Sequence, residues 1–185
     1  ACSGARLIDD SYNANPGSLK AAIETLAASG GTNWLVLGDM RELGEDAASL
    51  HAEVGRRAKA AGIARLYALG ELSAIAATAF GEAGRVFESH AVLADALRAD
   101  LAAFVGGASA PNAVDPLRVG AEAPPALRIL IKGSRGSAMD RIVKTLLADA
   151  ARGERRMLLE LTRWLEQLQS LFGLLAANGC KAFPA

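Results

Sequence analysis

Short apolar runs alternate with amphipathic stretches along most of this chain. The runs are bounded by polar or glycine residues, which is typical of buried strands. The amphipathic stretches carry apolar residues at spacings of three and four, as helices do when one face packs on a sheet. The predicted strands are 6–9, 33–37, 65–69, 85–87 and 127–131, and the predicted helices are 16–29, 46–61, 72–80, 90–104 and 137–150.

This regular alternation predicts the fold class. Strands joined by crossover helices lie parallel in one sheet, and the crossovers are right-handed. We therefore expect an α/β fold: a Rossmann-like, doubly wound and mostly parallel sheet with helices on both faces. The expected domain spans residues 1–150.

Two segments interrupt the alternation. Residues 105–126 contain two adjacent glycines and four prolines, and we interpret them as a Gly/Pro-rich surface insertion. Residues 151–185 are expected to form an appended segment with an amphipathic helix at 157–175 and a frayed end. Such a helix most often packs on protein. Contact with a membrane surface is the less favoured alternative, because the polar face is not rich in Lys and Arg.

Composition excludes several classes of function. The chain of 185 residues has 20 Lys+Arg and 20 Asp+Glu, so no overall basic field attracts nucleic acid. Cys2 and Cys180 have no metal-ligand spacing and no secretory signal is evident, which favours a reducing, cytoplasmic location. No uncharged apolar run reaches the ~20 residues of a membrane span. Because the chain starts without Met and close to its first strand, we expect a piece of a longer protein.

The first of three polar loops follows the first predicted strand, at residues 10–18. Its carboxylate could accept hydrogen bonds from ribose hydroxyls, its amides could donate and accept, and its phenol could stack on a ligand. Asn15 and Pro16 also suit the cap and the first position of a helix. A role in turn formation and capping alone is an equally supported alternative for these residues.

The second polar loop follows a buried strand at 38–44. Asp39 or Glu42 could contact a substrate or a neighbouring domain, but capping of the next helix is the alternative, and we favour it for Glu42. His51 is predicted to lie on that next helix, where we expect packing or hydrogen bonding in preference to catalysis.

The third polar loop, residues 132–137 (KGSRGS), connects the last strand to a helix. Its two cations and two hydroxyls suit an anionic group such as a carboxylate or phosphate, and a surface turn is the alternative. Because ligands bind at the carboxyl ends of parallel strands, we expect all three loops to meet at one edge of the sheet.

Several common motifs are missing. The chain has no G-x-x-x-x-G-K-[ST] phosphate loop, and no G-x-G-x-x-G opens the first helix. No cluster of carboxylates and histidines predicts a metal site. This chain alone therefore lacks the parts for phosphoryl transfer.

Four stretches, taken together, resemble one known family. They are residues 9–18 (DDSYNANPGS), 37–44 (LGDMRELG), 51–55 (HAEVG) and 131–135 (IKGSR), in this order. They resemble the C-terminal domain of the bacterial Mur ligase family, over about residues 6–148. Separately, residues 157–175 resemble the N-terminal start of phospho-N-acetylmuramoyl-pentapeptide transferase, a membrane enzyme.

The resemblance implies a domain that closes over ATP in a ligase of peptidoglycan synthesis, one that adds D-alanyl-D-alanine to a UDP-N-acetylmuramoyl-tripeptide. ATP and Mg²⁺ would be held mainly by a central domain, and the UDP-sugar by an N-terminal domain, both absent from this chain. No catalytic residue and no metal ligand is implied here. The implied nucleotide-binding residues are Asp10, Tyr12, Asn13 and Asn15, and the implied substrate-binding residues are Lys132, Ser134, Arg135 and Asp39.

Without the other two domains, the chain is expected to be inactive alone, because closure needs an opposing surface. The alternative function is a non-enzymatic interaction module that binds a partner through residues 157–175. A small nucleotide-binding regulator is a third option, which the missing phosphate loop disfavours.

Overall fold

The computed structural model describes residues 5–107 and 127–152. By its internal contacts the chain divides into a unit of Cys2–Leu146 and a second unit that comprises Ala1 and Leu147–Ala185. Residues 147–152 of the second unit are helical. The predicted helix at 157–175 and residues 108–126 of the predicted insertion lie outside the described residues.

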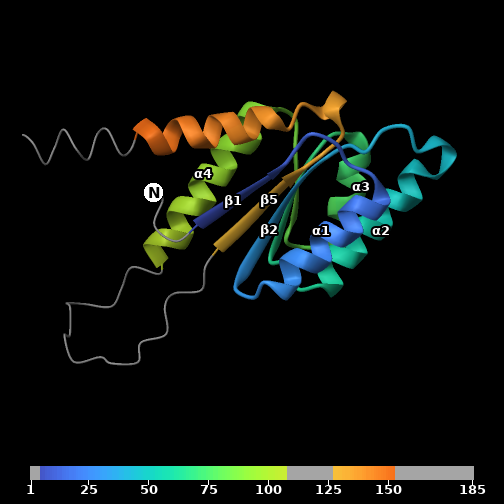
Figure 1. The fold of residues 1–185 in the computed structure, drawn as a ribbon, viewed down its shortest axis with the longest axis horizontal. Helices are drawn as coiled ribbons and strands as arrows, with labels where there is room; N and C mark the ends of the chain where they lie inside the picture. Colours follow the sequence, from blue (N-terminus) through green and yellow to red (C-terminus); the bar gives the residue numbers. More distant parts are fainter. Residues whose placement is uncertain (1–4, 108–126, 153–185) are drawn as a thin grey trace, which may run out of the picture. The chain divides into compact units, whose positions relative to one another are not determined.

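The first unit contains a single five-stranded sheet (Figure 1). Its strands lie in the order β1-β5-β2-β3-β4, and every neighbouring pair is parallel, which confirms the predicted α/β class. The strands are β1 (Ala5–Asp10), β2 (Thr32–Gly38), β3 (Arg65–Leu69), β4 (Gly84–Phe87) and β5 (Leu127–Lys132). The helices are α1 (Pro16–Ala28), α2 (Ala47–Ala60), α3 (Glu71–Phe80) and α4 (His90–Gly107), with short 3-10 turns at η1 (Gly44–Asp46) and η2 (Arg135–Ser137).

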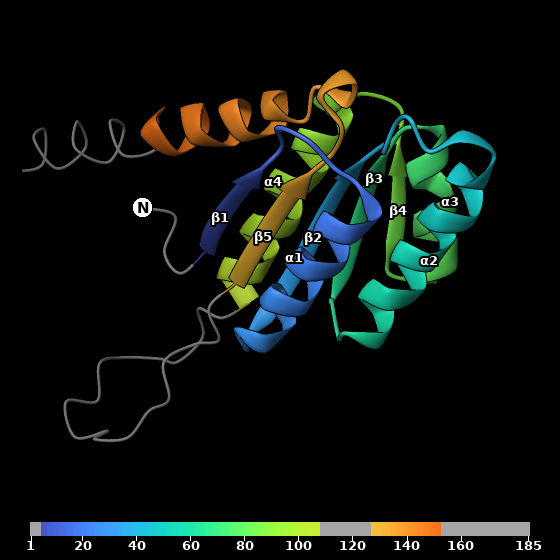
Figure 2. The same cartoon turned by 45° about the vertical axis from the view of Figure 1, so that its right-hand side comes forward.

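The direction of the chain decides which face each helix covers. From β1 to β4 the chain moves across the sheet in one direction, so right-handed crossovers place α1, α2 and α3 on the same face. The connection from β4 back to β5 runs the opposite way and places α4 on the other face, as Figure 2 shows. A helix that begins at residue 140 also packs on the α4 face, through Ile142 and Val143.

The two faces bury separate apolar cores because side chains alternate along each strand. On one face, strand residues such as Leu35 and Leu130 pack against α1, α2 and α3. On the other face, Trp34 and Ile129 belong to a cluster with α4. The strands are therefore apolar on both sides, which is why they appear in the sequence as short uninterrupted apolar runs.

Local sequence signals predict most helix ends to within one residue. Asn15 caps α1: its Oδ1 accepts from the Ser18 N–H at 2.8 Å, and the Ser18 hydroxyl accepts from the Asn15 N–H at 3.1 Å. This reciprocal capping box confirms the predicted cap. Two helix ends differ from their predicted positions by a full helical turn or nearly so. The helix predicted from residue 90 to 104 continues to Gly107, and the helix predicted from 137 begins at 140, because η2 and a left-handed Ala138 (φ 48°) precede it.

One carboxylate on α4 ties this helix to the sheet. Asp100 accepts a hydrogen bond from the Tyr67 hydroxyl at 2.7 Å and forms ion pairs with Arg65 at 2.9 Å and Arg85 at 2.8 Å. Burial alone would raise the pKa of Asp100, but the hydrogen bonds from Tyr67 and Arg65 and the charges of Arg65 and Arg85 lower it overall. Burial and the hydrogen bond to Asp100 raise the pKa of Tyr67.

We expect Asp100→Asn to lower the free energy of unfolding at pH 7 by about 2 kcal/mol, because hydrogen bonds and charges from three side chains are weakened. The folded-state pKa of Asp100 lies below its unfolded value, so its contribution is complete above the unfolded pKa and is lost as the pH falls through the folded pKa. Urea unfolding between pH 7 and pH ~3 would measure this. The variant should lose less stability on acidification than the parent. Asp95→Asn, which removes an exposed acid from the same helix, should change little, and equal losses in both variants would contradict the proposed role of Asp100.

Candidate functional site

Three polar loops leave the carboxyl ends of β1, β5 and β2, which are neighbours in the sheet. The loop after β1 leads to α1 on one face, whereas the loop after β5 leads to the helix on the α4 face. Chain connections that diverge in this way open a crevice at the carboxyl edge of a doubly wound sheet. The expectation that the loops meet at one edge is confirmed.

The loop after β1 is held in shape by its own side chains. Asp9 accepts hydrogen bonds through Oδ1 from the N–H of Ser11 at 3.1 Å and from its hydroxyl at 2.6 Å. The side-chain oxygen of Asn13 accepts from the Ala14 N–H at 2.9 Å. Tyr12, in contrast, is 76% exposed. The loop thus presents an aromatic ring on a constrained backbone.

Lys132, the last residue of β5, lies beneath this loop. The strand register places it opposite Asp10 of β1. Its ammonium donates to Asp10 Oδ2 at 2.6 Å and to the carbonyl oxygen of Asn13 at 3.0 Å. The lysine side chain is 2% exposed and the Asp10 side chain 45%. The structure therefore joins one expected substrate residue to two expected nucleotide residues.

Asp39, at the start of the loop after β2, caps a helix in a different part of the chain. Its Oδ1 accepts hydrogen bonds from the backbone N–H of Ser73 at 2.7 Å and from its hydroxyl at 2.8 Å. Ser73 lies in the first turn of α3, whose own N-cap residue, Gly70, has no side chain to accept this bond. Gly70 also has a φ of 120°, and a Cβ there would collide with the Asp39 carboxylate.

The backbone that follows Asp39 is anchored at each residue. The carbonyl of Asp39 accepts from the Ser134 N–H at 3.0 Å, and the Arg41 N–H donates to the Ser134 hydroxyl at 2.8 Å. Between them, the Met40 N–H donates to His51 Nε2 at 3.0 Å. His51 Nδ1 lies 2.7 Å from the Ala47 carbonyl, so its proton must be on Nδ1. His51 is a buried hydrogen-bonding residue, as predicted.

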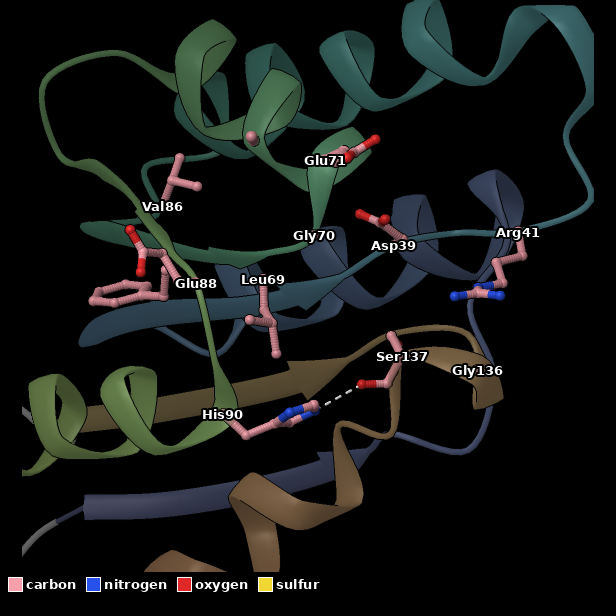
Figure 3. Close-up of a pocket in the computed structure, with 12 residues that line it drawn as sticks. Asp39, Arg41, Leu69, Gly70, Glu71, Val86, Glu88, His90, Gly136 and Ser137 are labelled. Carbon is pink, nitrogen blue, oxygen red and sulfur yellow. Dashed lines mark hydrogen bonds between the residues drawn. The ribbon is translucent and has the colours of Figure 1, made fainter.

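A pocket of about 480 Å³ opens beside these loops, at the carboxyl ends of β2, β3 and β4. Figure 3 shows Arg41 and Asp39 at one end of the pocket, with Glu71 and His90 on opposite sides. His90 Nε2 lies 2.8 Å from the carbonyl oxygen of Ser137. The lining residues are Asp39, Arg41, Leu69, Gly70, Glu71, Ala74, Val86, Phe87, Glu88, His90, Gly136 and Ser137.

Arg41 is the cation most directly presented to this pocket. Its backbone is fixed by Ser134, and its side chain packs over Gly136, where a Cβ would lie 2.9 Å from Arg41 Nε. Within residues 5–107 and 127–152, the structure gives its guanidinium no ion pair. Neither Arg41 nor the pocket is predicted from the sequence. The sequence signal for the pocket is the acidic residue shortly after each of β3 and β4, Glu71 and Glu88. Such residues are also common on ordinary solvent-exposed surfaces.

The remaining expected substrate residue, Arg135, is exposed in η2. Its guanidinium carbon lies 5.9 Å from the centre of the Tyr12 ring, within the range of a cation–π contact. Within the described part of the chain, no group of three or more His, Cys, Asp or Glu could hold a metal ion. No helix among those same residues is long and apolar enough to cross a membrane.

Comparison with known proteins identifies relatives of this domain. The family model for the "Mur ligase, glutamate ligase domain" matches residues 1–135. UDP-N-acetylmuramoyl-tripeptide--D-alanyl-D-alanine ligase of Escherichia coli K12 is 38% identical over 140 residues, which are 76% of this chain and 26% of that protein. The enzyme of the same name from Mycobacterium tuberculosis H37Rv is 33% identical over 166 residues, 83% of this chain and 31% of the relative.

Solved structures agree with these matches. A crystal structure of MurF from Acinetobacter baumannii superposes with a TM-score of 0.62 at 25% identity, over 78% of this chain and 28% of that one. MurF ligase from Thermotoga maritima in complex with ADP shares the fold, with a TM-score of 0.55 at 24% identity. The match covers 77% of this chain and 28% of that one. This chain spans less than a third of the length of each of these relatives.

We expect Asp39→Ala to lower the free energy of unfolding by about 1–2 kcal/mol, because α3 loses the acceptor for its first-turn N–H and the buried Ser73 hydroxyl loses its partner. Glu71→Ala is the matched control: it removes an exposed acid from the same helix end and should cost only about 0.3–0.5 kcal/mol. Urea unfolding of both variants measures the difference. A loss no larger for Asp39→Ala than for Glu71→Ala would show that Asp39 does not cap α3.

Proposed function

This chain belongs to the Mur ligase family, and we propose that it is the C-terminal domain of an ATP-dependent ligase that joins D-alanyl-D-alanine to a UDP-N-acetylmuramoyl-tripeptide in peptidoglycan synthesis. The observation that carries the proposal is the meeting of the family's motifs at one sheet edge. There, the loop that bears Tyr12 lies beside an anchored loop that bears Arg41. The two loops divide the edge into a nucleotide region and a pocket for the incoming amino component.

The nucleotide region is formed by Asp10, Tyr12, Asn13 and Asn15. The exposed Tyr12 ring is available to stack on a purine. Asp10 is bound to Lys132 through Oδ2, which leaves Oδ1 as an acceptor for a ribose hydroxyl. Asn13 and Asn15 hold the loop through their side-chain oxygens, and their NH₂ groups are left as donors. ADP in the Thermotoga structure is consistent with a nucleotide ligand in this family.

The amino component, D-alanyl-D-alanine, is proposed to occupy the 480 Å³ pocket. This zwitterion needs a cation for its carboxylate and acceptors near its ammonium. Arg41 supplies the first, with Arg135 on the adjacent loop, and Glu71 and Glu88 also line the pocket. Asp39 and Ser134 shape the walls by holding α3 and the Arg41 backbone.

The resemblance to the Mur ligase family assigns the phosphates of ATP and Mg²⁺ mainly to the central domain of the ligase. Mg²⁺ would supply charge neutralisation during phosphoryl transfer. The residues of this domain would position the adenosine and the amine nucleophile. We place this ligase in the bacterial cytoplasm, where its nucleotide-linked substrates are made. The alternative function, an interaction module built on residues 157–175, lies outside the described residues and is not favoured by the comparisons.

A chimaera tests the function directly. Replacing the matching C-terminal domain of the Escherichia coli ligase with residues 1–150 of this chain should give an enzyme that releases ADP only when both D-alanyl-D-alanine and the UDP-linked tripeptide are present. Mass spectrometry should detect the pentapeptide product. The assignment would be wrong if a folded chimaera formed no product and if the 185-residue chain also showed no NMR shifts in residues 10–15 or 39–41 with ATP and D-alanyl-D-alanine.

Two single substitutions in an active chimaera should separate the two regions. Tyr12→Ala should raise the KM for ATP about tenfold through loss of stacking, with little change in the KM for D-alanyl-D-alanine. Arg41→Met should raise the KM for D-alanyl-D-alanine at least about tenfold, because the dipeptide carboxylate loses a charged hydrogen bond, and should change the KM for ATP little. Arg56→Met, on the exposed surface of α2, should leave both constants unchanged. Loss of ATP affinity in Arg41→Met, or of dipeptide affinity in Tyr12→Ala, would refute this division.

A further inference from the structure

The most unusual buried group in the domain is the ammonium of Lys132. Its neighbours on β5 alternate between the two cores: Ile129 and Ile131 pack with α4, and Leu130 packs with α1. Strand alternation therefore directs Lys132 to the α1 face, beneath the loop that leads from β1 to α1. The side chain is only 2% exposed there, whereas lysine side chains in proteins are almost never fully buried unless they are paired.

Burial of an ammonium is costly unless its charge is paired and its protons are hydrogen-bonded. Lys132 finds both compensations on a single segment: the carboxylate of Asp10 and the carbonyl of Asn13. An apolar residue at this position would fill similar space without the desolvation penalty. Unlike an apolar side chain, the buried ammonium fixes the position of the loop, because it hydrogen-bonds two defined oxygens of that loop.

We propose that Lys132 is a positioning residue for the nucleotide loop, which it holds through Asp10 Oδ2 and the Asn13 carbonyl so that Tyr12 and the second oxygen of Asp10 face the ligand. The inference deepens the proposed function and rests on it for the identity of the ligand. In this role the ammonium acts through the loop and does not touch the carboxylate of D-alanyl-D-alanine, the contact that the sequence analysis expected.

The placement of the pocket supports this division. Both acceptors of Lys132 lie on the loop after β1, and Lys132 is not among the residues that line the 480 Å³ pocket. Arg135, three residues further along the chain, is exposed. Two cations of one short loop thus have different environments: one is enclosed under the nucleotide loop, and the other is open to solvent beside Tyr12.

Steady-state kinetics of the active chimaera give the first test. Lys132→Met, which keeps an unbranched side chain about as long as the aliphatic part of lysine and removes the charge, should raise the KM for ATP about tenfold or more and leave the KM for D-alanyl-D-alanine within about threefold. Arg56→Met, on the exposed surface of α2, is the control and should leave both constants unchanged. A rise confined to the KM for D-alanyl-D-alanine in Lys132→Met would overturn the proposal in favour of direct contact.

Amide hydrogen exchange in the complete 185-residue chain tests the positioning without catalysis. Lys132→Met should accelerate exchange of the Ser11 and Ala14 amides about tenfold more than that of β3 amides such as Ala68. Lys144→Met, which removes an exposed lysine, should change neither group. Uniform acceleration across the domain would show a general stability effect and overturn the proposal.

A double substitution keeps the test informative if a single variant unfolds because it leaves a charge unpaired. Lys132→Met leaves Asp10 unpaired, and Asp10→Asn leaves the lysine partly unpaired, but the double variant removes both charges. We expect the double variant to show less exchange at Ser11 and Ala14 than the product of the two single effects, because the side chains act as one unit. Independent effects would contradict the pairing. Since these measurements need no product formation, an inactive chimaera would count against the proposed function and not against the role of Lys132.

Discussion

The position of β5 between β1 and β2 is the constraint on which the site depends. The chain runs across the sheet from β1 to β4 and then returns, and β5 pairs with both β1 and β2. Only this insertion brings Lys132 within 2.6 Å of Asp10, a residue 122 positions earlier in the chain. The same insertion lets Ser134 accept a hydrogen bond from the Arg41 backbone. A different strand order would leave the same loops apart, whatever their residues.

The polar residues at this edge divide into two groups by their exposure. Asp39, His51, Lys132 and Ser134 make hydrogen bonds inside the domain and hold backbones in place. Tyr12, Arg41 and Arg135 are exposed on those backbones. Such a division favours binding, because side chains that are already oriented lose less conformational entropy when a ligand arrives. It also accounts for the many polar residues after three short strands: the buried ones stabilise the loop backbones, and the exposed ones remain available to contact a ligand.

Most of the fold could be predicted from local patterns, and part of the site could not. Short apolar runs located the strands and period-3.6 patterns located the helices of the described sheet domain, and the Asn15–Pro16 pair located the start of α1. The late start of the last helix was missed because Ala138 adopts a left-handed conformation without the Gly or Asn that usually signals one. The Asp39–Ser73 and Lys132–Asp10 contacts were missed for another reason. They join elements far apart in the chain, and strand order and register, which bring them together, are not encoded in any local window.

Tyr12 bears on what the domain does with its exposed edge. Within the described residues it is the most exposed of the large hydrophobic side chains, and it lies on a loop held by three of its own side chains together with Lys132. A flexible loop could turn such a ring toward the core, whereas this loop keeps it in water at a cost of about 1.5–3 kcal/mol relative to burial. That cost is recovered only when a ligand or an opposing surface covers the ring. This chain spans less than a third of the length of its relatives, and under the proposed function the opposing surface would be supplied by the other ligase domains. Under the proposed function, a nucleotide bound between the two surfaces would bury Tyr12, and the constrained loop would then couple ATP binding to domain closure.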